Sequence, residues 1–187
     1  MPFQNWRKPL RIGVFLFLVF LTIVILFNAG DYRVSILDKV AFHLHEAGHV
    51  FFQIITLFMG RFLILIGGTV LEVGFPLGFA FLLFKNQAFF SGSCFIWWAG
   101  KIFIGVGAYM ADARAQKIVL FPHMRAGVPG DWYYIFESLG LLNFDVIIGT
   151  LVKIFGVVTM VAALWLAGYF AWHQQDFVEE PEEPNLL

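Results

Sequence analysis

Residues 45 to 49 read His-Glu-Ala-Gly-His, inside the apolar stretch 36–58. An α-helix turns every 3.6 residues, so His45 and His49 project from one helix face and can ligate one ion. Glu46 stands beside them and completes the H-E-x-x-H arrangement, in which two neutral imidazoles bind zinc and the glutamate is the general base. Zinc polarises a scissile carbonyl and makes water more acidic. The motif therefore predicts zinc-dependent peptide hydrolysis.

The alternative is that three polar residues fell together by chance. In a soluble protein this is a serious alternative, because the motif fixes only three positions. In a membrane it is weaker, since ionisable side chains at mid-depth are costly and usually functional. We therefore expect metal binding by His45 and His49. We expect His43, which points away from their face, to have a polar packing role.

A catalytic zinc usually has three protein ligands and a water, so one further donor is needed. Membrane depth favours Glu72, because it lies near the middle of the apolar stretch 62–84, level with the motif in the preceding stretch. Two imidazoles with a distant glutamate also resemble the ligand set of the thermolysin-like metalloproteases. Gly67 and Gly68 would let the two helices approach closely. The sequence predicts Glu72 as the third ligand.

Lys101 lies near the middle of the stretch 88–111, at the depth expected for the metal. A lysine in mid-membrane needs a carboxylate partner. It would pair with Glu72, pair with Glu46, or face an aqueous cavity and stabilise the oxyanion that develops during hydrolysis. The sequence leaves these three alternatives open, and the first two would disable the site.

The composition is that of an integral membrane protein. The chain has 187 residues, of which 60% are hydrophobic and 13% charged, and its mean hydropathy is +0.80. The net charge of −1 provides no basic footprint for nucleic acid. The single cysteine, Cys94, lies in an apolar run and is expected to pack as a small hydrophobe.

Several apolar stretches are long enough to cross a hydrocarbon core, which takes about 20 helical residues. They are 12–30, 36–58, 62–84, 88–111 and 146–172. The second is the most polar and alternatively lies flat at the interface. The distribution of lysine and arginine favours a span with a cytoplasmic N-terminus.

The fold class predicted is an all-α polytopic membrane protein with about five transmembrane helices and the HExxH motif on the second. The connection 113–145 adds an interfacial amphipathic helix, with Trp132, Tyr133 and Tyr134 at the membrane surface. Residues 1–173 form one transmembrane domain. Residues 174–187 form an acidic tail that is expected to be disordered.

His45, Glu46 and His49 make the chain similar to the site-2 protease group of intramembrane zinc metalloproteases. It resembles more closely short bacterial membrane proteins often classed with that group, through HEAGH, FLILIGGT, FIWWAGK, YMADARAQ and DWYYIFESLGLL. The resemblance implies a zinc peptidase of the bacterial inner membrane that cleaves membrane-anchored or membrane-proximal proteins.

Site-2 proteases take their third zinc ligand from an aspartate in a later helix containing an Asn-x-x-Pro stretch, and this chain has no such stretch. Asp112 is the nearest analogue by order along the chain, so it is the alternative third ligand. A salt bridge from Asp112 to Arg114 or Lys117 is the competing interpretation.

A second hypothesis is a catalytically silent membrane subunit or assembly factor that keeps a metalloprotease-like fold within a larger membrane complex. Lys101 and the missing Asn-x-x-Pro stretch motivate it. It predicts stable partner subunits and normal function after Glu46→Gln.

Overall fold

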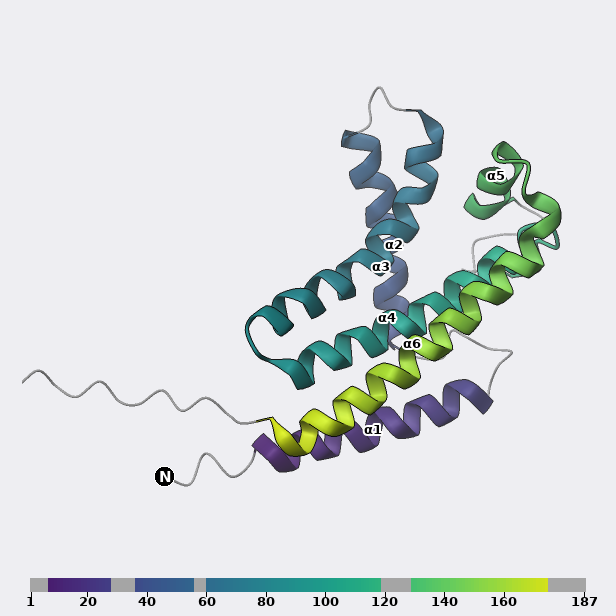
Figure 1. Cartoon of the computed structure of the whole chain (residues 1–187). Helices are drawn as coiled ribbons and strands as arrows, with labels where there is room; N and C mark the ends of the chain where they lie inside the picture. Colours follow the sequence, from purple (N-terminus) through teal and green to yellow (C-terminus); the bar gives the residue numbers. More distant parts are fainter. Residues whose placement is uncertain (1–6, 28–35, 56–59, 119–128, 175–187) are drawn as a thin grey trace, which may run out of the picture.

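The computed structural model describes residues 7–27, 36–55, 60–118 and 129–174, and these are helical with short connections (Figure 1). The elements, in chain order, are α1 (Arg7–Phe27), α2 (Ile36–Ile55), α3 (Arg61–Lys85), α4 (Phe89–Ala111), α5 (Asp131–Ser138), the 3-10 helix η2 (Leu142–Phe144) and α6 (Asp145–His173). The predicted all-α class is confirmed. The acidic tail beyond Gln174 lies outside the described residues.

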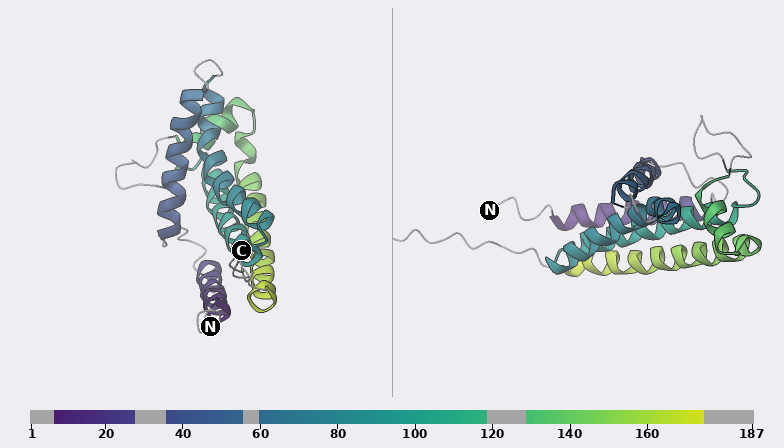
Figure 2. Two further views of the ribbon diagram at one scale, coloured as in Figure 1. Left: turned by 90° about the vertical axis from the view of Figure 1, so that its left-hand side faces the viewer. Right: turned by 90° about the horizontal axis from the view of Figure 1, so that it is seen from above.

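The centre of the molecule is the antiparallel pair of α4 and α6, which lie side by side in both views (Figures 1 and 2). Glycines form the seam between them. A Cβ on Gly107 would lie 2.5 Å from the carbonyl oxygen of Gly149, and one on Gly100 would lie 2.9 Å from that of Gly156. Small residues bring helix backbones together in membranes, where association depends on close packing. At one end of the seam, Arg114 pairs with Asp145 at 2.7 Å.

The start of α1 contacts the end of α6. Arg11 donates a hydrogen bond of 3.0 Å to the carbonyl oxygen of Gln174, and Phe15 packs edge-on against Trp172. The two helices are therefore antiparallel, and the first and last helices have these ends on the same side of the molecule (Figure 1). If both cross a membrane, the number of crossings from first to last is even.

Four helical segments of the described residues are long and apolar enough to cross a membrane. They are Arg7–Phe27, Arg61–Lys85, Phe89–Ala111 and Leu142–His173. Helix α2 is not among them, because charged residues and histidines interrupt its apolar sequence. Four crossings agree with the antiparallel contact of α1 and α6, whereas the predicted five would separate the contacting ends.

Helices α2 and α3 pack closely as neighbours, and α2 crosses α4 at a wide angle (Figures 1 and 2). Gly48 of the motif sits against Gly67 and Gly68 of α3, where an added Cβ would lie 2.8 Å from the Gly68 Cα. This confirms the predicted close approach at these two glycines. Helix α3 bends on its way to α4, and Pro76 lies inside it, where a proline removes a backbone hydrogen bond (Figure 1).

The short helix α5 buries one face and exposes the other, as an amphipathic helix does. Its buried residues are Trp132, Ile135 and Phe136. It contacts α3 and α4, and the guanidinium of Arg61 lies 4.5 Å from the ring centre of Tyr134. Helix α5 thus joins the start of α3 to the end of α4 and brings its own first residue, Asp131, against α2.

Candidate metal centre

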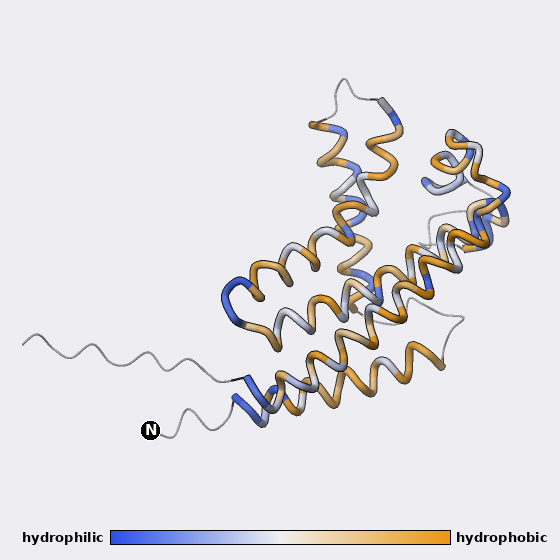
Figure 3. The backbone as a smooth tube through the Cα atoms, in the orientation of Figure 1, coloured by the Kyte–Doolittle hydropathy of each residue, from blue (hydrophilic) through white to orange (hydrophobic). Residues whose placement is uncertain are grey.

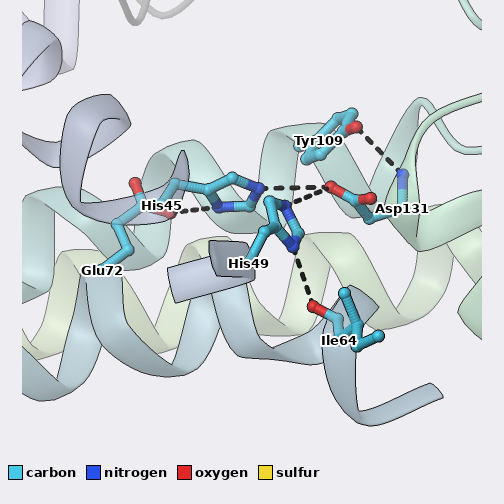
Figure 4. Close-up of polar contacts among 6 residues, drawn as sticks. All are labelled: His45, His49, Ile64, Glu72, Tyr109 and Asp131. Atoms are coloured by element: carbon cyan, nitrogen blue, oxygen red, sulfur yellow. Dashed lines mark hydrogen bonds and ion pairs between the residues drawn. The ribbon is translucent and has the colours of Figure 1, made fainter. Parts of the chain in front are cut away.

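The two motif histidines lie together on α2, with ring centres 4.7 Å apart (Figure 4). His45 is buried, whereas His49 is partly exposed. The Nε2 atoms of both rings lie 3.2 Å from the same oxygen, Oδ2 of Asp131. Ligand atoms of these three residues all lie within 4.8 Å of one another. Two imidazoles and one carboxylate therefore converge on a single point, as a metal site requires.

The other nitrogen of each ring is held by an acceptor. His49 Nδ1 lies 2.8 Å from the carbonyl oxygen of Ile64, and His45 Nδ1 lies 3.1 Å from Oε2 of Glu72. A carbonyl oxygen only accepts, and a carboxylate does the same, so these contacts assign a hydrogen to Nδ1 in both rings. The Nε2 atoms face the Asp131 carboxylate in the same way and donate to it, so each ring in this arrangement carries two hydrogens. Loss of the Nε2 hydrogens to a metal ion would turn both lone pairs toward the centre, as in carboxylate–histidine–metal arrangements.

Gly68 forms the wall of the centre on the α3 side. A Cβ built on Gly68 would lie 2.7 Å from His45 Nε2 and 2.7 Å from His49 Nε2. A methyl group would therefore occupy the space in front of both ligand atoms. The second glycine of FLILIGGT, Gly68, is needed because the α3 backbone passes close to the two nitrogens there.

Asp131 enters the centre from the first turn of α5. Its backbone N–H donates a hydrogen bond of 3.1 Å to the Tyr109 hydroxyl of α4. Gly130 makes this approach feasible, because a Cβ there would lie 2.7 Å from the Tyr109 ring carbon that carries the hydroxyl. Burial alone would raise the pKa of Asp131, but the hydrogen bonds from both imidazoles outweigh it and hold that pKa well below its ordinary value. The carboxylate is therefore ionised and available as a ligand.

Asp131 was not among the ligands predicted from the sequence. The third ligand was predicted from its depth in the membrane, which can be assigned only to residues of helices expected to span. Asp131 belongs to the connection 113–145 and had no such depth. One signal was available, because Asp131 opens DWYYIFESLGLL, a segment that carries the family resemblance. That segment had been explained entirely by its aromatic residues.

The two predicted third ligands occupy other positions. Glu72 reaches the centre, but it contacts Nδ1 of His45, on the side of the ring away from Asp131 (Figure 4). It therefore orients His45 in this arrangement. Asp112 accepts a hydrogen bond of 2.7 Å from the backbone N–H of Ile118 and holds the turn after α4. The salt bridge proposed for it does not form with Arg114, which pairs with Asp145.

Lys101 pairs with Asp38 of α2, which is not one of the two carboxylate partners predicted for it. Lys101 therefore does not pair with Glu72 or with Glu46, and the two pairings that would disable the site do not occur. Asp38 lies seven residues before His45, roughly 10 Å along the helix. The wide crossing of α2 over α4 separates Lys101 from the metal centre, and this pairing places it away from the proposed oxyanion position.

Glu46 is exposed on α2, next to His45 in the sequence. Its side chain is therefore accessible to water. His43 is also exposed, and its Nδ1 lies 2.6 Å from the carbonyl oxygen of Lys39. His43 therefore points away from the centre, as predicted.

Comparisons with protein-family models, with curated proteins and with solved structures found no match for this chain.

Proposed function

We propose that the protein is a membrane-embedded zinc metallopeptidase whose metal ligands are His45, His49 and Asp131. The observation that carries the proposal is the convergence of both Nε2 atoms on Oδ2 of Asp131, with both Nδ1 atoms already bonded elsewhere. The three side chains come from α2 and from α5, far apart in the chain, and the motif histidines together with a distant carboxylate make the ligand set that a catalytic zinc needs.

The donor set favours zinc among the common ions. Calcium and magnesium prefer oxygen ligands, whereas two imidazole nitrogens and one carboxylate oxygen are a typical catalytic zinc set with one position left for water or substrate. Zinc held there would act as a Lewis acid toward the scissile carbonyl and make water acidic enough to supply hydroxide near neutral pH.

The protein's own residues have separate tasks in this mechanism. Glu46, exposed beside His45, accepts a proton from water and returns it to the leaving amine. Glu72 and the Ile64 carbonyl oxygen fix the orientation of the two imidazoles. Tyr109 fixes the start of α5 and with it the position of Asp131.

The proposed substrates are proteins anchored in the membrane or lying next to it, and the proposed location is a bacterial inner membrane with the N-terminus in the cytoplasm. The apolar helices support a membrane location. The substrate class and the assignment to the bacterial inner membrane rest on the resemblance to site-2 proteases.

The test combines zinc content with cleavage of a membrane-anchored reporter by the purified protein. We expect about one zinc per chain in the wild type, as in mononuclear catalytic sites, and none after His45→Ala with His49→Ala. Glu46→Gln should keep the zinc and lose cleavage. A wild-type protein without a transition metal would contradict the proposal. Unchanged function in Glu46→Gln, with tightly bound partner subunits, would instead favour the silent-subunit hypothesis.

A further inference from the structure

The exposed surface of α2 is divided lengthwise into two stripes. The polar stripe consists of Lys39, His43, Glu46 and Gln53, all exposed. At 100° per residue these four positions fall within an arc of about 80°, in which Val50 is the one apolar residue. The general base proposed above therefore belongs to a continuous polar face that extends along the helix.

The apolar stripe lies beside it. It includes Ile36, Val40, Phe51 and Ile54, whose exposed fractions are 77%, 43%, 51% and 66%. The remaining face, with Ala41, His45 and Gly48, is buried. A helix with a packed face, a polar face and an apolar face fits the boundary between water and lipid, where the last two meet different solvents.

The position of the metal centre along α4 agrees with that placement. Tyr109, which bonds Asp131, lies two residues before Ala111, the last residue of α4. This is about 14 Å from the middle of the helix and only about 3 Å along the axis from its end. Polar residues cluster at this end of the α4–α6 pair, where Arg114 meets Asp145 (Figure 3).

The cost of the alternative decides between the two placements. At mid-membrane depth the exposed His43 and Glu46 would face hydrocarbon, which strongly disfavours charged and polar groups. At the boundary they face water, and the apolar stripe faces acyl chains. In the part of the chain that the structure describes, the four helical segments apolar enough to span do not include α2.

We propose that α2 rises from the middle of α4, where Asp38 pairs with Lys101, to the membrane boundary at the end of α4, with Glu46 facing water, so that the site takes peptide segments located at the membrane surface. The substrate is then the extended segment flanking a membrane anchor, and a bond in the middle of a span is out of reach. In the reaction, water adds to the peptide carbonyl carbon, the C–N bond breaks, and a carboxylate and an amine are released. The substrate assignment rests on the proposed peptidase function, whereas the placement of α2 does not.

Thiol labelling tests the placement without any activity. In a Cys94→Ser background, single cysteines replace His43 on the polar stripe, Val40 one turn away on the apolar stripe, and Val158 on the exposed side of α6. The protein is placed in lipid nanodiscs, which expose both membrane faces, and treated with a charged maleimide. Because a thiolate does not form in hydrocarbon, we expect His43→Cys to react faster than the other two by on the order of tenfold or more. Equal protection of His43→Cys and Val40→Cys would overturn the placement.

A substrate series tests the second half of the proposal. One cleavable sequence is moved stepwise from the flank of a single membrane anchor to its middle, and cleavage by the zinc-loaded protein is measured at each position. We expect cleavage at the flank and loss of cleavage toward the middle. Equal or faster cleavage at the middle would overturn the inference while sustaining the peptidase. Cleavage at no position, with zinc bound, would contradict the peptidase, and labelling would still decide the placement.

Discussion

In the proposed metal centre, each histidine uses one ring nitrogen for a structural contact and offers the other to the metal. Glu72 and the Ile64 carbonyl oxygen hold the Nδ1 atoms, while Asp131 lies in front of both Nε2 atoms. The sequence predicted both histidines, and it predicted correctly that Glu72 lies level with them on the neighbouring helix. It could not identify which ring nitrogen Glu72 meets, because that depends on the rotation of α3 against α2.

Replacing the carboxylates of Asp131 and Glu72 by amides, one at a time, distinguishes their roles. Asp131→Asn should abolish zinc binding, because it removes an anionic ligand. Glu72→Gln keeps an oxygen that can accept the His45 hydrogen, so zinc affinity should fall by about 10- to 100-fold, as for other partners of ligating histidines. Competition titration with a chromophoric chelator measures both. Equal losses in the two variants would restore Glu72 as a direct ligand.

Gly68 provides a sharper test of the centre's position. In Gly68→Ala, the new methyl group would lie 2.7 Å from both Nε2 atoms and should displace the metal. Gly74→Ala is the matched control on the same helix, because nothing lies within 4 Å of its added Cβ. There, alanine should leave zinc binding intact and change the free energy of unfolding by no more than about 1 kcal/mol. Normal zinc affinity in Gly68→Ala would place the metal elsewhere.

At the scale of elements, apolar length and composition predict the long helices well. The boundaries expected for the long apolar stretches agree with α3, α4 and α6 to within one residue, and α2 begins at the expected residue, whereas α1 begins five residues earlier than expected. The relative directions of the helices were less accessible, because depth matching treats every helix as parallel to the membrane normal. Helix α2 crosses α4 at a wide angle, so Asp38 meets Lys101, and a short helix outside the spans delivers Asp131.

The link between α4 and α5 can be tested through one hydroxyl. Tyr109→Phe removes the acceptor for the Asp131 backbone N–H, a contact worth about 1 kcal/mol. The start of α5 should loosen, and zinc affinity should fall about fivefold at constant helix content, as that energy allows. Tyr133→Phe is the control, since within the described part of the chain that hydroxyl bonds only Glu137 of the same helix, in an exposed position. Isothermal titration compares them, and equal zinc affinities would exclude a positioning role for Tyr109.

At the scale of the whole molecule, the packed pair of α4 and α6 supports the metal centre, because Tyr109 of α4 holds the start of α5. Glycines spaced seven residues apart on both helices pair along the seam between them, Gly100 with Gly156 and Gly107 with Gly149. The sequence shows this spacing, but not that these two helices are partners. The antiparallel contact of α1 with α6 adds a second constraint, because it requires an even number of membrane crossings from the first helix to the last.

The seam predicts a clear difference between two glycines of α4. In Gly100→Ala, the new methyl would lie 2.6 Å from the Met160 backbone nitrogen, so the helices must separate, at a cost of about 1–3 kcal/mol. Gly105→Ala adds a methyl to open space and should leave stability nearly unchanged. Thermal unfolding in one detergent compares the two variants with the wild type. A Gly100→Ala protein as stable as Gly105→Ala would contradict the packed seam.

The most direct measurement of the central claim is an anomalous difference map recorded at the zinc absorption edge from crystals of the zinc-loaded protein. We predict one peak, within ligand distance of His45 Nε2, His49 Nε2 and an Asp131 carboxylate oxygen, and next to Gly68. A peak bonded to Glu72, or no peak beside the two imidazoles, would contradict the metal centre described here.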